Sequence, residues 1–260
     1  MSFNRWICGP AMLLLAVSAA AALPRPAGLE PDIRFWTRVF AEVPSQQALI
    51  HDNRHLDIIY ARIDVPDSGD RRAKRRVSER ARTKYQKILR TLAAGRRDGL
   101  TAEQARVLAL WPADVSNDEL RRAAGRVRFQ QGLADGFRAG LIRSGRWEAH
   151  ILDSLRAADV PEELAALPHV ESSYNPAARS HVGAAGLWQF TRSTGRRFMQ
   201  IDHVVDERRD PWRSSEAAAA LLQYNYSILK SWPLAITAYN HGVAGMRRAL
   251  LPTGTRATET

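Results

Sequence analysis

The sequence predicts a mostly α-helical protein. Apolar residues recur at intervals of three and four along most of the 260-residue chain, which is the spacing of one helical face. At 101–104 and 116–119 a Thr or Ser is followed three residues later by Gln or Glu, a combination that caps helix starts. The alternation typical of strands is scarce, and we expect only a short hairpin around His181–Ala185.

The first 22 residues are predicted to be a secretory signal. Arg5 precedes an apolar run from Ala11 to Ala22, which is too short to span a bilayer comfortably and ends in three alanines suited to cleavage. The only cysteine, Cys8, lies before this run, so it is badly placed to accept a lipid. We therefore expect cleavage after Ala22, a mature chain that begins at Leu23 without disulfides, and a location in the periplasm or cell envelope.

The chain is basic, with 38 Lys and Arg against 27 Asp and Glu and a net charge of +11. Much of the excess lies between Arg71 and Arg97. Such a run attracts nucleic acid, anionic lipid or an acidic polymer, and it is also what a solvated helix face looks like. Nucleic acid is disfavoured because the chain is expected to be exported and the run lacks interleaved aromatic residues.

Residues 23–140 are predicted to form a helical N-terminal region, to which the sequence assigns no role. Helical spacing occurs at 35–40, 56–63 and 85–92, with a break at Pro66–Gly69. From 126 to 158 it is nearly continuous, interrupted at Ser144–Gly145. The apolar residues on the first three faces are Phe35, Trp36, Val39, Phe40, Leu56, Ile59, Tyr60, Ile63, Tyr85, Ile88, Leu89 and Leu92.

Glu171 is the first candidate functional residue. A helix is predicted to begin at Pro161 and to stop at Asn175–Pro176. Leu164, Leu167 and Glu171 share one face of it, which should be apolar. A buried acid is costly unless it is paired or protonated. Taken alone, a glutamate at this position would be read as a capping or salt-bridged residue. The residues that follow it in the sequence point to a different role.

Two features follow Glu171. Gly183 and Gly186 enclose two alanines directly before Leu187, Trp188 and Gln189. This pattern indicates that the backbone there passes close to another group, because glycine has no side chain to prevent it. An aromatic residue and an amide after a glycine turn suit a groove that binds sugar rings, although Trp188 taken alone is more readily a core residue than a sugar platform. Helices rich in small residues follow at Ser214–Leu222 and Pro233–Asn240, the second ended by His241–Gly242. They predict a compact domain over residues 141–260.

Three blocks of this domain resemble a known family. They are E-S-x-x-N-P-x-A-x-S at 171–180, G-A-x-G-L-W-Q at 183–189 and A-Y-N-x-G at 238–242. Together they resemble the soluble-type lytic transglycosylases, whose catalytic domain is goose-lysozyme-like. The segment 205–215 also resembles the membrane-bound lytic murein transglycosylase D branch. The resemblance extends from Leu164 to Leu250.

The resemblance implies a peptidoglycan lytic transglycosylase in which Glu171 acts as acid and then as base. The substrate's own N-acetyl group and C6 hydroxyl would replace a second carboxylate. The substrate-binding residues that it implies are Ser180, Gly186, Leu187, Gln189, Tyr239 and Asn240. A muramidase on the same scaffold and a non-catalytic peptidoglycan-binding protein remain alternatives.

The same resemblance implies peptidoglycan glycan strands as partner, an association with the cell envelope, no nucleic acid and a monomer. No metal or cofactor is expected, since the histidines at 169, 181, 203 and 241 lack metal-ligand spacing.

The sequence departs from the family pattern in three places. Phe190-Thr191-Arg192 stands where the family has a hydrophobic residue and Met-Pro, so a subsite contact is expected to differ. A further tyrosine-bearing motif normally lies downstream, and the sequence given ends at Thr260 without it; we therefore expect a catalytic domain truncated at its C-terminus. The residues given after the domain contain no carbohydrate-binding repeat, whereas many members of the type D branch carry one.

Overall fold

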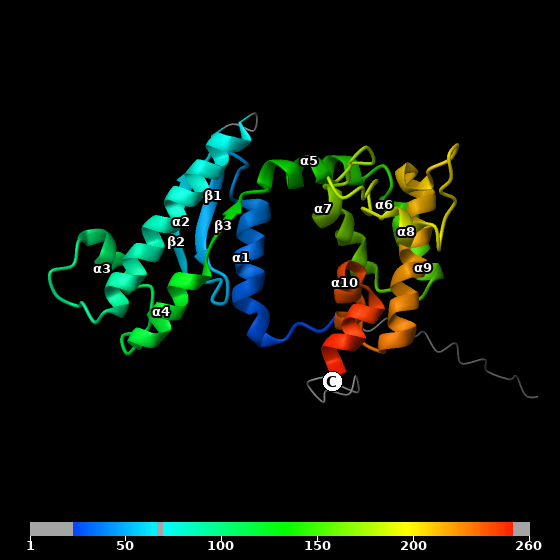
Figure 1. Ribbon diagram of the computed structural model, residues 1–260. Helices are drawn as coiled ribbons and strands as arrows, with labels where there is room; N and C mark the ends of the chain where they lie inside the picture. Colours follow the sequence, from blue (N-terminus) through cyan, green and yellow to red (C-terminus); the bar gives the residue numbers. More distant parts are fainter. Residues whose placement is uncertain (1–22, 67–69, 252–260) are drawn as a thin grey trace, which may run out of the picture.

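The computed structural model describes residues 23–66 and 70–251, and the predicted signal at 1–22 lies outside this part. The described chain is mostly helical, as the sequence predicts. Figure 1 shows the sheet with α2–α4 to its left and α1 to its right, and α5 across the top leading to a second group formed by α6–α10. No helix in the described ranges is long and apolar enough to cross a bilayer.

The N-terminal side begins with a short 3₁₀ helix (η1, Ala27–Leu29) and α1 (Glu30–Ala41). Three helices follow the first two strands: α2 (Arg71–Ala93), α3 (Ala102–Leu108) and α4 (Asn117–Arg126). Both expected helix starts are present. Thr101 forms a complete capping box with Gln104, whereas the Ser116 hydroxyl accepts the Glu119 amide. The cationic side chains of α2 are mostly exposed, and its apolar side, including Leu89 and Leu92, is buried as predicted.

A three-stranded antiparallel sheet corrects the prediction of an all-helical N-terminal region. Its strands are β1 (Gln47–Asp52), β2 (Ile59–Asp64) and β3 (Val127–Gln131), in the order β2-β1-β3. The helix expected over 56–63 was therefore wrong. The helical stretch expected over 126–158 was wrong only at its start, because helices cover 134–144 and 148–157 and the break at Ser144–Gly145 is confirmed. Apolar segments this short fit helix and strand spacing equally well. Pairing across the sheet decides that these segments are strands. β1 pairs with β2 on one side and with β3 on the other, and five of its six residues are buried.

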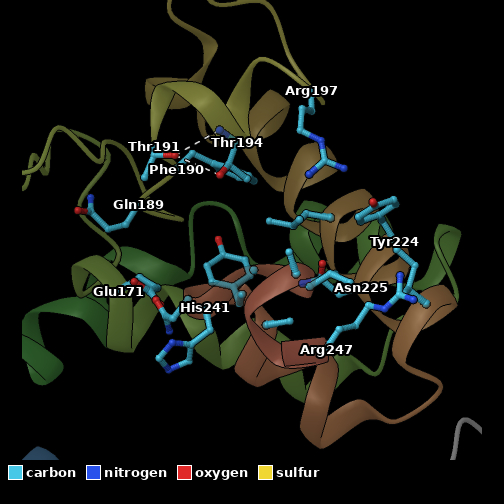
Figure 2. Close-up of a pocket in the computed structure, with 18 residues that line it drawn as sticks. Glu171, Gln189, Phe190, Thr191, Thr194, Arg197, Tyr224, Asn225, His241 and Arg247 are labelled. Atoms are coloured by element: carbon cyan, nitrogen blue, oxygen red, sulfur yellow. Dashed lines mark hydrogen bonds between the residues drawn. The ribbon is translucent and has the colours of Figure 1, made fainter. Parts of the chain in front are cut away.

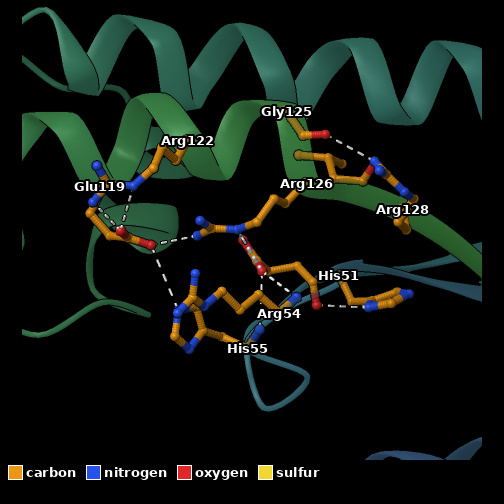
Figure 3. Close-up of polar contacts among 10 residues, drawn as sticks. His51, Arg54, His55, Glu119, Arg122, Gly125, Arg126 and Arg128 are labelled. Carbon is orange, nitrogen blue, oxygen red and sulfur yellow. Dashed lines mark hydrogen bonds and ion pairs between the residues drawn. The ribbon is translucent and has the colours of Figure 1, made fainter. Parts of the chain in front are cut away.

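A buried polar network ties β1 to α4 (Figure 3). The Asp52 side chain is fully buried and accepts hydrogen bonds from the backbone amides of Arg54 and His55, at 2.8 and 3.0 Å. The Arg126 guanidinium donates to Asp52 at 3.0 Å and to Glu119 at 2.6 Å. Hydrogen bonds from Arg122 and Arg126 lower the pKa of Glu119 to about 2. A buried carboxylate is tolerated only with such compensation.

The C-terminal side is built from α5 (Ala134–Ser144), α6 (Glu148–Ala157), a 3₁₀ helix (η2, Glu162–Ala166), α7 (Leu167–Ser172), α8 (Arg192–Gly195), a second 3₁₀ helix (η3, Glu207–Arg209), α9 (Pro211–Leu229) and α10 (Trp232–Leu250). One apolar core, from Trp147 to Leu222, unites α6 and α9 with the turn around Trp188. Ala217, Ala218 and Ala219 are buried and let α6 and α10 approach α9. Gly242, with φ 68°, breaks α10 into two helices, so the shorter helix predicted from Pro233 is confirmed.

Arg126→Met is expected to lower the free energy of unfolding of the sheet by about 3–5 kcal/mol, because Asp52 stays buried without its counter-charge. Hydrogen exchange of the β1 and β2 amides measures this loss. Arg121→Met is the matched control: Arg121 forms an exposed ion pair with Asp118 on the same helix, and its loss should cost less than ~1 kcal/mol. Equal protection in the two variants would contradict the role given to Asp52.

Candidate active site

A cavity of about 580 Å³ opens between α7, the segment from Gln189 to Arg197, α9 and α10 (Figure 2). Its walls come from segments far apart in the sequence, brought together by the core around Trp188. The lining residues are Glu171, Gln189, Phe190, Thr191, Thr194, Arg197, Leu221, Tyr224, Asn225, Ile228, Ala238, Tyr239, Asn240, His241, Gly242, Val243, Ala244 and Arg247.

Glu171 lies in the last turn of α7 and is half-buried. Leu164 is buried and Leu167 packs against the same core, so Glu171 sits where this apolar layer meets the cavity. Burial raises the pKa of the Glu171 carboxyl above its ordinary value, and a hydrogen bond from Asn240 opposes the shift in part. The direction is the one that acid catalysis requires.

The helix that carries Glu171 differs from the prediction at both its start and its end. It starts as η2 and continues as α7, and it stops at Ser172 rather than at Asn175–Pro176. Ser173 and Tyr174 adopt left-handed conformations, with φ of 52° and 55°. Such strain needs compensation. The Arg143 guanidinium on α5 donates to both their carbonyls, and the Tyr174 hydroxyl donates to Ala165 at 2.6 Å.

The glycine turn beside Glu171 is buried rather than open. Gly186 has φ 82°, and a Cβ there would collide with the Arg208 carbonyl, so the close backbone approach expected from the sequence is present. Leu187 and Trp188 are fully buried. The Trp188 indole donates to Ser215 at 2.9 Å, which makes it a core residue and not a platform for sugar rings.

Two hydrogen bonds join this turn to the neighbouring elements. The Ser172 hydroxyl, next to Glu171, donates to the Leu187 carbonyl at 2.8 Å. The Tyr239 hydroxyl on α10 donates to the Trp188 carbonyl at 2.7 Å. Burial and the charge of Glu171 hold the pKa of Tyr239 well above its ordinary value, so it remains a hydrogen-bond donor.

Glu171 is the only carboxylate among the described residues that line the cavity. The acids that follow it in the chain are engaged elsewhere, beginning with Asp202, which accepts hydrogen bonds from Gln200 and Val205. Asp206 pairs with Arg208 at 2.7 Å, and Glu207 pairs with Arg213 at 3.3 Å. Asp210 caps α9 by accepting two backbone amides. The described residues also contain no group of three or more His, Cys, Asp or Glu that could hold a metal ion.

Residues 151–260 match the family described as transglycosylase SLT domain. We call this matched part of the chain the SLT domain. The chain is also 35% identical to membrane-bound lytic murein transglycosylase D of Escherichia coli (strain K12) over 121 residues, which are 46% of this chain and 27% of that relative. A putative tributyltin chloride resistance protein of Alteromonas sp. (strain M-1) is 35% identical over 114 residues, which are 42% of this chain and 55% of that protein.

The matched region therefore spans about a quarter of the first of these relatives and about half of the second. It confirms the predicted family and, with the helical structure, the predicted class of a mostly helical chain with a lysozyme-like domain.

The SLT domain brings together half of the binding residues named from the sequence. Gln189, Tyr239 and Asn240 line the cavity with Glu171. The Gln189 side-chain amide donates to the Gly186 carbonyl at 2.8 Å, so it also braces the turn.

The other three lie outside the cavity lining. Gly186 and Leu187 are buried in the turn. Ser180 borders a separate depression with His181, Gly183 and Arg208, and its hydroxyl accepts the Ala184 amide at 3.0 Å. The hairpin expected at 181–185 is a turn closed by a single bridge between Arg179 and Ala185.

Several residues that line the cavity were not predicted from the sequence. Arg197, Tyr224, Asn225 and Arg247 belong to none of the three motif blocks. Tyr224 and Ile228 are four residues apart on α9, a helical spacing that does not tell a cavity wall from a core face. Only the packing of α9 against α10 places them at the site.

Asn240→Leu is expected to raise the pKa of Glu171 further, because the amide donates to the ionised carboxylate and leucine cannot. The carboxyl would then stay protonated to higher pH. A ¹³C NMR titration of glutamate-labelled protein measures the pKa, and Glu171→Gln assigns the resonance by removing it. An unchanged or lower pKa in Asn240→Leu would rule out this hydrogen bond as a control on the acid.

Proposed function

We propose that the SLT domain is a peptidoglycan lytic transglycosylase, which cleaves the β-1,4 bond between N-acetylmuramic acid and N-acetylglucosamine and leaves a 1,6-anhydromuramoyl end. The observation that carries this proposal is the half-buried Glu171, the only carboxylate among the described lining residues, with its pKa raised by burial. The relationship to lytic murein transglycosylase D supports it.

A cavity lined by a single carboxylate limits which glycosidase mechanisms are possible. Glycosidases ordinarily use two carboxyl groups, one as acid and one as base or nucleophile. The acids that follow Glu171 in the chain are engaged elsewhere: Asp202 accepts hydrogen bonds from nearby residues, and the next three are bound in ion pairs or a helix cap. A substrate that supplies its own nucleophile removes the need for a second carboxyl group on the enzyme. In N-acetylmuramic acid the N-acetyl oxygen can stabilise C1, and the C6 hydroxyl can act as the nucleophile.

The reaction proposed proceeds in two steps. Protonated Glu171 first donates its proton to the glycosidic oxygen, the C1–O4 bond breaks, and the N-acetyl oxygen stabilises C1. The C6 hydroxyl then attacks C1, and the ionised Glu171 accepts its proton as the anhydro ring closes. Proton and leaving group balance, and Glu171 ends protonated as it began. Acid and then base work by one group suits a pKa raised towards neutrality.

The neighbouring residues are proposed to hold the sugar and the acid. Asn240 donates to the Glu171 carboxylate and so stabilises it during the second step. Tyr239 and Gln189 form the wall beside it. Gly186 and Leu187 are proposed to act through the shape of the turn, and Ser180 through its own loop, because their contacts lie there.

For the whole chain we propose export by residues 1–22, a helical and sheet-containing region at 23–140 whose role stays open, and a catalytic domain from residue 141. The protein would act as a monomer in the periplasm or cell envelope on glycan strands, without nucleic acid, metal or cofactor. Two hydrophobic cores confined to the N-terminal side and a third on the C-terminal side support this division.

Glu171→Gln is expected to reduce release of muropeptides from purified sacculi at least ~10²–10⁴-fold, because acid and base catalysis are lost together. Glu163→Gln, which neutralises an exposed acid in the preceding η2 helix, should keep wild-type activity.

Mass spectrometry of the wild-type products is the second readout. Non-reducing ends lighter by one water indicate a transglycosylase, whereas reducing ends would make the domain a muramidase. Undiminished release by Glu171→Gln would remove Glu171 from the mechanism. Glycan binding without release by the wild type would indicate a binding protein.

N-terminal sequencing of the protein recovered from cells is expected to begin at Leu23, because the three alanines at 20–22 follow the apolar run. A retained Met1 or a lipidated cysteine would contradict both the predicted signal and the periplasmic location.

A further inference from the structure

The end of the cavity remote from Glu171 carries two arginines that the proposed chemistry does not use. Figure 2 shows Glu171 and His241 at one end, and Arg197, Tyr224 and Arg247 at the other. Both guanidinium groups belong to the lining. Neither contributes to the pKa shift of Glu171, which burial and Asn240 account for. The cavity is therefore acidic at one end and cationic at the other.

Neither arginine has an anionic partner within the described part of the chain. Their side chains form no ion pair and no hydrogen bond with any residue of 23–66 or 70–251. Nearby arginines are used differently: Arg192 and Arg208 both pair with Asp206, and Arg213 pairs with Glu207. Arg197 and Arg247 thus keep their donors available to a ligand.

An aromatic residue fixes the position of one of these cations. The Arg197 guanidinium carbon lies 4.6 Å from the centre of the Tyr224 ring and 5.2 Å from that of Phe198. A guanidinium that stacks on a ring face keeps its in-plane donors free, and these match the two oxygens of a carboxylate. Tyr224 itself is 38% exposed, so this end of the cavity is open to a large ligand.

We infer that Arg197 and Arg247 form a subsite for a carboxylate of the peptide stem on a muramic acid residue of the strand. The inference rests on the proposed function. The sugar rings of the substrate carry no charge of their own, whereas the peptides attached to muramic acid carry carboxylates. The cationic end of the cavity therefore complements the peptide and not the rings, and the domain selects strands that still bear peptides.

The ratio of kcat/KM on two substrates tests this selection. One substrate is glycan strands with their peptide stems, and the other is the same strands after carbodiimide coupling to ammonia has converted the stem carboxylates to uncharged amides. The wild type is expected to prefer the first. The double variant Arg197→Gln/Arg247→Gln should lower the preference about tenfold or more, which is the scale of a lost charge-assisted contact.

A control of equal charge separates local contact from long-range attraction. Arg209→Gln/Arg248→Gln also removes two exposed cations of the same domain, and neither residue lines the cavity. The preference should survive in this control. An equal fall in both double variants, or a preference unchanged by Arg197→Gln/Arg247→Gln, would overturn the subsite.

Binding tests the subsite without catalysis. In the Glu171→Gln background, calorimetry with a peptide-bearing muropeptide should show about tenfold weaker affinity when both cavity arginines are replaced. If the wild type cleaves nothing but this difference persists, the proposed function fails and the subsite stands. If cleavage occurs and neither the affinity nor the preference depends on the arginines, the subsite fails alone.

Discussion

The hydrogen bond from the Ser172 hydroxyl to the Leu187 carbonyl joins the two segments on which the site depends. One carries Glu171 and the other is the buried turn from Gly186 to Gln189. The same turn receives the Tyr239 hydroxyl of α10 and, through the Trp188 indole, bonds to Ser215 of α9. Because three helices are attached to a few consecutive residues that cannot move without opening the core, the Glu171 carboxyl is held at one depth.

That depth determines the electrostatics of the site. A fully buried carboxyl would be neutral at any ordinary pH, and a fully exposed one would be ionised. Glu171 lies between these limits, with burial raising its pKa and Asn240 opposing the shift. The basic segment after the turn is neutralised locally by pairs such as Arg208 with Asp206, so the positive charge left in the cavity lies at its remote end.

The residues before the matched family region also shape the site. Arg143 lies on α5, ahead of residue 151, and its guanidinium binds the carbonyls of Ser173 and Tyr174 directly after α7. It satisfies acceptors that the end of a helix leaves open. A Cβ at Gly140 on the same helix would lie 3.0 Å from the Ser173 carbonyl oxygen and 3.1 Å from the His169 ring, so the two helices pack closely there. The packing of α5 on α7 thus supports the SLT domain, although the N-terminal side has hydrophobic cores of its own.

The sequence by itself determined the helical class and the family, and it singled out Glu171 as the candidate acid, because each depends on residues close together in the chain. Helical spacing, caps and the three blocks at 171–180, 183–189 and 238–242 are local patterns. Only the tertiary structure decided which residues share a space. The sheet needs β1 to pair with β3, about 80 residues away, and the left-handed end of α7 needs Arg143. Arg247 reaches the cavity because α10 packs on α9, and Arg197 does so because the segment after α8 places it over Tyr224 of α9. Long-range packing leaves no periodic trace in the sequence, because the free energy that favours it comes from partners on other segments.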